Sequence, residues 1–100
     1  MSVRIAVERG QIESFCRRWS VKELSLFGSV LREDFGPDSD VDVLVDLQDG
    51  HGLSLYDWVD MIDELKAIFG REVHLVAKKG LKNPLRRDEV LRTAETVYAA

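Results

Sequence analysis

One segment of eight residues, DVDVLVDL at positions 40–47, constrains the fold of this chain more than any other. Its alternation predicts a β-strand with an apolar face made by Val41, Val43, Val45 and Leu47. Asp40 and Asp42 fall on the opposite face. A strand with a valine face has to pack on a core, so the two carboxylates are expected to be held rigidly near each other.

The patterns on either side of this strand predict the order α-β-α-β-α-β-α. Residues 9–19 show a helical stripe, and residues 22–27 form a short apolar run that ends at Gly28. A short helix is expected from Ser29, and a turn at 36–39 precedes the strand. Ser54 and Asp57 predict the start of a helix with its apolar stripe on Leu55, Trp58, Ile62, Leu65 and Phe69, and Gly70 predicts its end.

The last part of the chain predicts one more strand and one more helix. Residues 71–77, REVHLVA, are typical of a short strand, and residues 78–83 form a polar connection. Pro84 predicts the start of a final helix. Its apolar residues are Val90, Leu91, Ala94, Val97 and Tyr98. The predicted fold class is therefore α/β (α+β): a small mixed sheet of three or more strands, with helices packed on one face.

Composition indicates a single domain over residues 1–100, with 45% hydrophobic and 32% charged residues. The net charge of −4 argues against direct nucleic-acid binding and against binding to a membrane surface. No apolar run is long enough to span a membrane, and the N-terminus lacks the pattern of a secretion signal. The single cysteine, Cys16, cannot form an intramolecular disulfide, which favours a reducing, cytoplasmic location, and it is interpreted as a structural or incidental thiol.

The spacing of Asp40 and Asp42 suits a hard cation. Two adjacent carboxylates repel each other, and Mg²⁺ removes the repulsion while it binds substrate phosphates and water. A solvent-facing strand side is the alternative, and the spacing alone does not separate the two. An EF-hand loop fits poorly, because Val43 stands where that loop needs glycine.

Gly28 and Ser29 complete the pattern. Backbone N–H groups at a helix start attract anions, and glycine lets the backbone approach a phosphate closely. Arg32, one turn further on, is a third candidate for phosphate contact. No P-loop or G-x-G-x-x-G motif is present. A phosphate cradle followed by a carboxylate pair is what metal-assisted nucleotidyl transfer requires.

The stretch LFGSVLRED…DSDVDVLV resembles the minimal nucleotidyltransferases (MNT) of the polymerase-beta-like superfamily. The resemblance implies the nucleotidyltransferase fold, with Gly28 and Ser29 at the triphosphate of an NTP such as ATP. It implies that Asp40 and Asp42 bind Mg²⁺, and that a nucleoside monophosphate passes to an acceptor hydroxyl. It also implies a HEPN-domain partner, with this chain as the antitoxin of a toxin–antitoxin pair.

The chain departs from the family pattern at one position. Active members carry a third carboxylate in a V-D-L-V context, and here the stretch is Val73, His74, Leu75, Val76. His74 is predicted to face the site, where imidazole can act as a general base but is a poorer Mg²⁺ ligand than carboxylate. Glu72, two positions earlier, is expected on the same face. His51, in a loop, is expected to be solvated.

Two functions follow, and both stay open at this point. The first is an Mg²⁺-dependent nucleotidyltransferase that modifies a partner protein or a small acceptor. The second is a catalytically impaired binding module that neutralises its partner by contact. A DxD glycosyltransferase is set aside because such enzymes need a longer chain. A domain of this size leaves its nucleotide site open on one side, so a partner protein or an oligomer can complete it.

Overall fold

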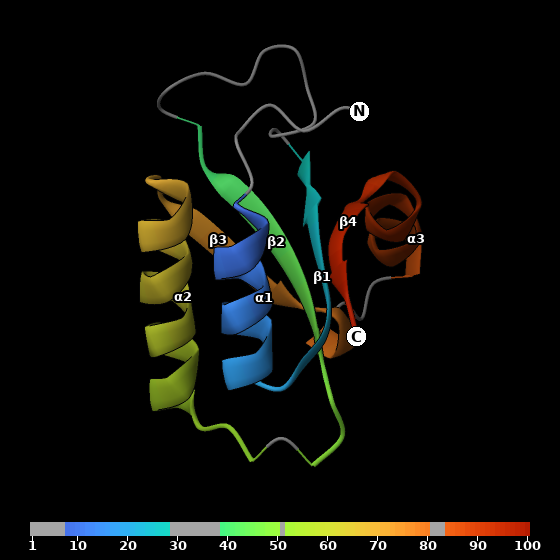
Figure 1. Ribbon diagram of the computed structural model, residues 1–100. Helices are drawn as coiled ribbons and strands as arrows, with labels where there is room; N and C mark the ends of the chain where they lie inside the picture. The colour runs from blue at the N-terminus through green and yellow to red at the C-terminus, as the bar shows by residue number, and fades with distance from the viewer. Residues whose placement is uncertain (1–7, 29–38, 51, 81–83) are drawn as a thin grey trace.

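The fold is a four-stranded mixed sheet with helices on both faces (Figure 1). The computed structural model describes residues 8–28, 39–50, 52–80 and 84–100. The predicted helix after Gly28 and most of the turn before Asp40 lie outside these residues. The elements are α1 (Arg9–Arg18), β1 (Val21–Phe27), β2 (Val41–Leu47), α2 (Leu55–Phe69), β3 (Val73–Ala77), the short 3₁₀ helix η2 (Lys78–Gly80), α3 (Pro84–Thr93) and β4 (Glu95–Ala99).

The strand order β3-β2-β1-β4 places β2 inside the sheet. β2 runs antiparallel to β1 and parallel to β3, whereas β4 is antiparallel to the other side of β1. In this register Asp42 lies between Phe27 on β1 and His74 on β3. The three segments singled out by the sequence therefore become neighbours at one end of the sheet.

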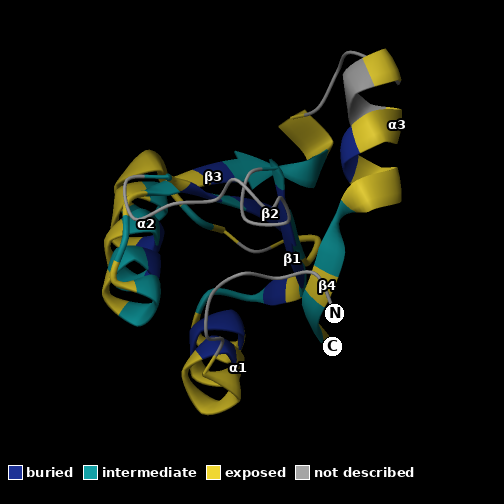
Figure 2. Cartoon of the chain, turned by 90° about the horizontal axis from the view of Figure 1, so that it is seen from above, coloured by how far each residue is buried: buried dark blue, intermediate teal, exposed yellow. Residues whose placement is uncertain are grey.

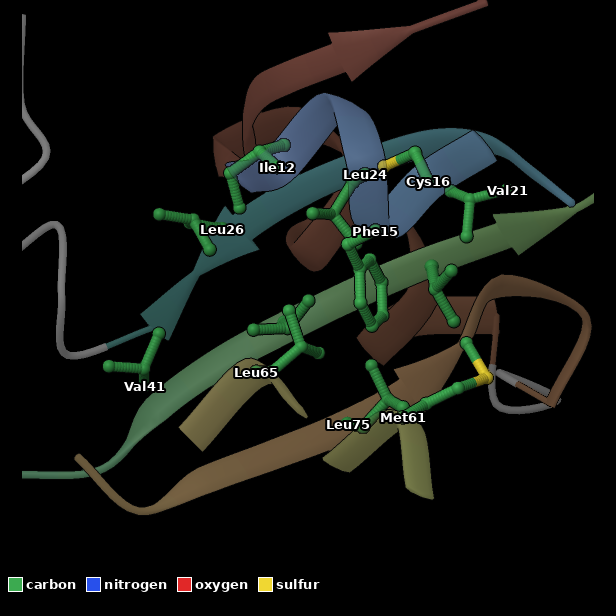
Figure 3. Close-up of a cluster of buried hydrophobic side chains, with 12 residues drawn as sticks. Ile12, Phe15, Cys16, Val21, Leu24, Leu26, Val41, Met61, Leu65 and Leu75 are labelled. Atoms are coloured by element: carbon green, nitrogen blue, oxygen red, sulfur yellow. The ribbon is translucent and has the colours of Figure 1, made fainter. Parts of the chain in front are cut away.

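The valine face of β2 packs into the main core, as its alternation predicts. Val41, Val43 and Val45 are fully buried beneath α1 and α2 (Figure 3). Helix α1 contributes Ile12, Phe15 and Cys16, and helix α2 contributes Met61 and Leu65; the remaining buried members are Val21, Leu24, Leu26 and Leu75. This packing fixes β2, because a slip of one residue would turn its valines toward the other face.

The opposite face of the sheet is partly covered as well, which corrects the prediction of helices on one face. Val90 of α3 is buried against Phe27 and Leu44, and Val76 packs beside them. Figure 2 shows α3 on the far side of the sheet from α1. Leu44, the one apolar residue on the acidic face of β2, supplies the reason: it and Phe27 need a hydrophobic cover.

Helix α2 begins and ends as its sequence predicts. Ser54 and Asp57 form a reciprocal capping box, and Gly70 closes the helix in the left-handed conformation with φ 67°. The apolar stripe differs from the prediction at its first member, since Leu55 is 84% exposed. Met61 is buried in its place. Within the described ranges, no helix is long and apolar enough to cross a bilayer.

The last element corrects a second prediction. Helix α3 starts at Pro84 as expected but ends at Thr93, and Glu95–Ala99 forms strand β4. The spacing of Ala94, Val97 and Tyr98 fits a helix in isolation. The β-branched Thr96 and Val97 favour a strand, and β1 offers an edge whose residues pair with Glu95, Thr96, Tyr98 and Ala99.

Candidate active site

Asp42 is the centre of the candidate site because β2 carries its carboxylate away from the valine core. The side chain is 24% exposed, so it is half-sheltered but open to a ligand. Its two oxygens lie toward different neighbours: Oδ1 toward His74 on β3 and Oδ2 toward Gly28 at the end of β1. Rigid strands on both sides therefore hold this carboxylate in place.

Gly28 lies directly against Asp42. Its φ of 72° is a left-handed conformation that glycine adopts at no steric cost. A Cβ atom built on Gly28 would overlap Asp42 Oδ2 and would lie 3.2 Å from Asp42 Cγ. Glycine is thus required twice at this position, once by backbone conformation and once by close approach of the carboxylate.

His74 faces the site, as the alternation of β3 predicts. Its Nδ1 atom lies 3.5 Å from Asp42 Oδ1, and its side chain is 65% exposed. Val73 and Leu75, on either side of it, pack against the main core. The imidazole therefore stands beside the carboxylate with most of its surface open to solvent or substrate.

Asp40 lies at the same end of the sheet but not within the strand. Strand β2 begins at Val41, whose N–H donates to the Glu72 carbonyl at 2.9 Å. Asp40 precedes this first ladder bond and is exposed. Asp40 thus lies just before the strand, whereas Asp42 lies within it.

Glu72 does not share the site, contrary to the expectation from its spacing. Its carboxylate pairs with Lys66 of α2 at 3.2 Å, and α2 covers the valine face of the sheet. Glu72 precedes β3, so strand alternation does not control its side chain. Ser29, Arg32 and His51 lie outside the described residues.

Further along the acidic face of β2, away from the candidate site, Asp46 forms an ion pair. Asp46 Oδ2 lies 4.0 Å from Lys78 Nζ in the 3₁₀ helix that follows β3. Extending the alternation His74, Val76, Lys78 by one step would have found this pairing. Beyond it, a hydrogen bond from Lys79 lowers the pKa of Asp49. These lysines neutralise one end of the face, whereas the ion pair of Asp42 at the other end is with His74.

The donors near Asp42 suit a cation that also takes ligands from a substrate. Among the described residues, no group of three or more His, Cys, Asp or Glu side chains is gathered closely enough to hold a metal alone. A site built on two carboxylates needs phosphate oxygens and water to fill its shell, which is the usual arrangement for Mg²⁺. The arrangement thus fits the class of sites that bind a phosphate-containing substrate through a divalent cation, here on a mixed α/β sheet.

Comparison with known proteins agrees with that class. Residues 8–96 match the nucleotidyltransferase domain family, and this chain belongs to that family. Within the family it is related to the MntA antitoxins of MntA–HepT pairs. The protein adenylyltransferase MntA of Thermococcus cleftensis is 40% identical over 81 residues, which cover 81% of this chain and 77% of that protein.

Solved structures share the fold. A structure assigned as a minimal nucleotidyltransferase is 34% identical, covers 87% of this chain and 86% of its own, and superposes with a TM-score of 0.72. A toxin–antitoxin complex with AMP-PNP (18% identity; 94% and 75% covered) superposes at 0.72. An MntA–HepT complex (17% identity; 92% and 70% covered) superposes at 0.63. The predicted nucleotidyltransferase fold is confirmed.

Proposed function

We propose that this protein transfers AMP from ATP to a hydroxyl group of a HEPN-domain partner, and so acts as the antitoxin of a toxin–antitoxin pair. The observation that carries the proposal is the juxtaposition of Gly28, Asp42 and His74 at one end of three paired strands. The proposal is also supported by the similarity of this chain to the protein adenylyltransferase MntA.

The reaction is a displacement at the α-phosphorus of ATP. The acceptor oxygen forms a bond to that phosphorus, the bond to the β-phosphate bridging oxygen breaks, and pyrophosphate leaves. The proton of the acceptor hydroxyl passes to a base or to water. In the proposal Gly28, Ser29 and Arg32 bind the triphosphate, so that the α-phosphorus lies beside Asp42.

Asp40 and Asp42 are the residues that would hold a divalent cation. The fit rests on the chemistry of the donor set and on Gly28, whose missing side chain leaves room for the Asp42 carboxylate. When bound, such a cation neutralises charge on the phosphate oxygens. All-oxygen donors would favour Mg²⁺. Through such a cation the carboxylates would orient the triphosphate, and β2 keeps Asp42 fixed as the nucleotide binds.

His74 has two chemical options at the third position. Neutral imidazole can accept the proton of the acceptor hydroxyl, or it can donate a ring nitrogen to the cation. Both options keep His74 beside Asp42, where the family resemblance places a carboxylate. The open surface of the ring leaves room for an acceptor side chain from the partner.

The test is transfer of labelled AMP from ATP to a purified HEPN-domain protein, with the HepT partner of a related MntA as the first candidate. Asp42→Asn should abolish labelling, because an amide binds a cation far more weakly than a carboxylate does. Asp46→Asn is the matched control, since Asp46 lies on the same strand and the same face but pairs with Lys78. Equal labelling by wild type and Asp42→Asn, with the fold intact by circular dichroism, would contradict the proposal.

A second function is favoured by one observation, the imidazole at the third carboxylate position. A catalytically impaired module would neutralise the partner by contact alone. Growth assays with the toxin distinguish the two functions. If Asp42→Asn still binds and neutralises the toxin like wild type, contact is sufficient. If it binds the toxin but fails to neutralise it, chemistry is required.

A further inference from the structure

We propose that His74 is a ligand of the catalytic cation together with Asp42, and that it makes the site favour Mn²⁺ over Mg²⁺. This inference rests on the proposed function, because it concerns the same cation. It selects one of the two options for His74, and it predicts a metal preference that an all-carboxylate site would not have.

The distance between the two side chains supports a shared cation. The Nδ1–Oδ1 separation of 3.5 Å lies beyond the usual 2.7–3.2 Å of an N–H···O hydrogen bond. Two donors that are each about 2.1 Å from one ion lie roughly 3.0–3.4 Å apart at bond angles of about 90–110°. The observed separation of 3.5 Å is closer to this range than to the hydrogen-bond range.

The strand register keeps the two donors together. Asp42 and His74 are direct neighbours on the parallel strands β2 and β3. Leu75 is buried next to His74, and Val43 is buried next to Asp42, so the main core anchors both strands just behind the donors. Within the described part of the chain, His74 forms no other ion pair or hydrogen bond that would hold its ring elsewhere.

The nature of the donors sets the preference among cations. Mg²⁺ binds oxygen ligands nearly exclusively and gives up water reluctantly. Imidazole is a ligand of transition-metal ions rather than of Mg²⁺, and Mn²⁺ is a transition-metal ion that shares the affinity of Mg²⁺ for carboxylate oxygens and water. Mn²⁺ therefore accepts every donor in this mixed set, while Mg²⁺ gains little from His74. An ion pair between protonated His74 and Asp42 is the competing explanation, and at this exposure such a pair would be weak.

Pulsed electron paramagnetic resonance tests direct coordination without depending on activity. The protein is produced with isotope-labelled histidine and loaded with Mn²⁺ and a non-hydrolysable ATP analogue. A hyperfine signal from the labelled nitrogen is expected in wild type and in His51→Ala, which removes the other of the two histidines. The signal should vanish in His74→Ala. Absence of the signal in wild type with Mn²⁺ bound would overturn the inference.

Metal affinities provide a second readout. Calorimetric titration should show that His74→Ala weakens Mn²⁺ binding by about tenfold or more, the usual scale for losses around a metal site, and changes Mg²⁺ binding much less. His74→Asp should strengthen Mg²⁺ binding and reduce the preference for Mn²⁺. Equal losses for both ions in His74→Ala would contradict the proposed preference. A labelled-nitrogen signal without AMP transfer would reject the enzymatic function but leave the coordination intact.

Discussion

Gly28 and Asp42 lie so close together that a side chain at position 28 would displace the Asp42 carboxylate. The left-handed backbone at Gly28 turns the chain at the end of β1 and leaves a gap that the Asp42 carboxylate fills. The candidate site therefore depends on the absence of a side chain as much as on the presence of a carboxylate.

Replacing Gly28 by alanine should damage both stability and function. The left-handed conformation costs a non-glycine residue about 1–2 kcal/mol, and the new methyl group would displace Asp42. We expect a lower urea midpoint and a loss of AMP transfer. Gly70→Ala is the control: its φ of 67° imposes a similar backbone cost, but its Cβ meets no atom within 4 Å. Unchanged AMP transfer in Gly28→Ala would refute the role of this contact.

Single residues also show where prediction from sequence succeeds. The orientation of His74 and Asp42 followed from strand alternation, because each lies within a regular strand whose neighbours are packed. The same rule was wrong for Glu72 and placed Asp40 within a strand that begins one residue later. Strand alternation does not predict side-chain direction for residues outside the hydrogen-bonded ladder. Glu72 is such a residue, and its side chain points toward Lys66, with which it forms an ion pair.

At the scale of elements, α1 and α2 are joined by one polar cluster above the core. Trp19 Nε1 donates to Glu64 Oε2 at 2.6 Å, and Arg18 Nη1 donates to Glu64 Oε1 at 3.3 Å. Glu64 therefore ties the end of α1 to the middle of α2. Both helices cover the valine face of β2, so this link contributes to the positioning of the candidate site.

Glu64→Ala should destabilise the protein by about 1–3 kcal/mol, because the partly buried indole N–H loses its acceptor. Urea denaturation followed by tryptophan fluorescence would measure the change. Glu13→Ala serves as control, since Glu13 pairs with Arg17 on the exposed side of α1 and such pairs contribute at most about 0.5 kcal/mol. Equal effects of the two changes would show that the link between helices is unimportant.

Among the described elements, the order was predictable up to the last one. Helix α2 carries its own signals in Ser54, Asp57 and Gly70, so local sequence determined both of its ends. Strand β4 has no comparable local signals in its sequence. Its residues satisfy a helical spacing, and only the open edge of β1, more than sixty residues earlier in the chain, selects the strand. Pairing over that sequence distance cannot be inferred from a local pattern.

At the scale of the whole molecule, the core contains a group that responds to alkaline pH. Burial raises the pKa of the Cys16 thiol from its ordinary value of 9.0 to about 12. Between these two values the unfolded chain loses the thiol proton and the folded chain keeps it. Stability should therefore fall as pH rises above 9.0, by as much as about 1.4 kcal/mol per pH unit.

This pH dependence can be measured by urea unfolding at about pH 8 and about pH 10.5. Wild type should lose more stability between the two conditions than Cys16→Ala, which carries no thiol at this position. Other groups titrate equally in both proteins, so the difference isolates Cys16. Identical pH dependence in the two proteins would show that the thiol ionises as easily in the core as in the unfolded chain.

The position of β2 between strands β1 and β3 affects which residues of the candidate site can be substituted without disturbing the sheet. Asp42 lies on β2, which is paired on both sides, whereas His74 lies on β3 at the margin of the sheet. Substitutions at that margin disturb few neighbours. A substitution at position 74 can therefore change the chemistry beside Asp42 without moving the strand that carries it.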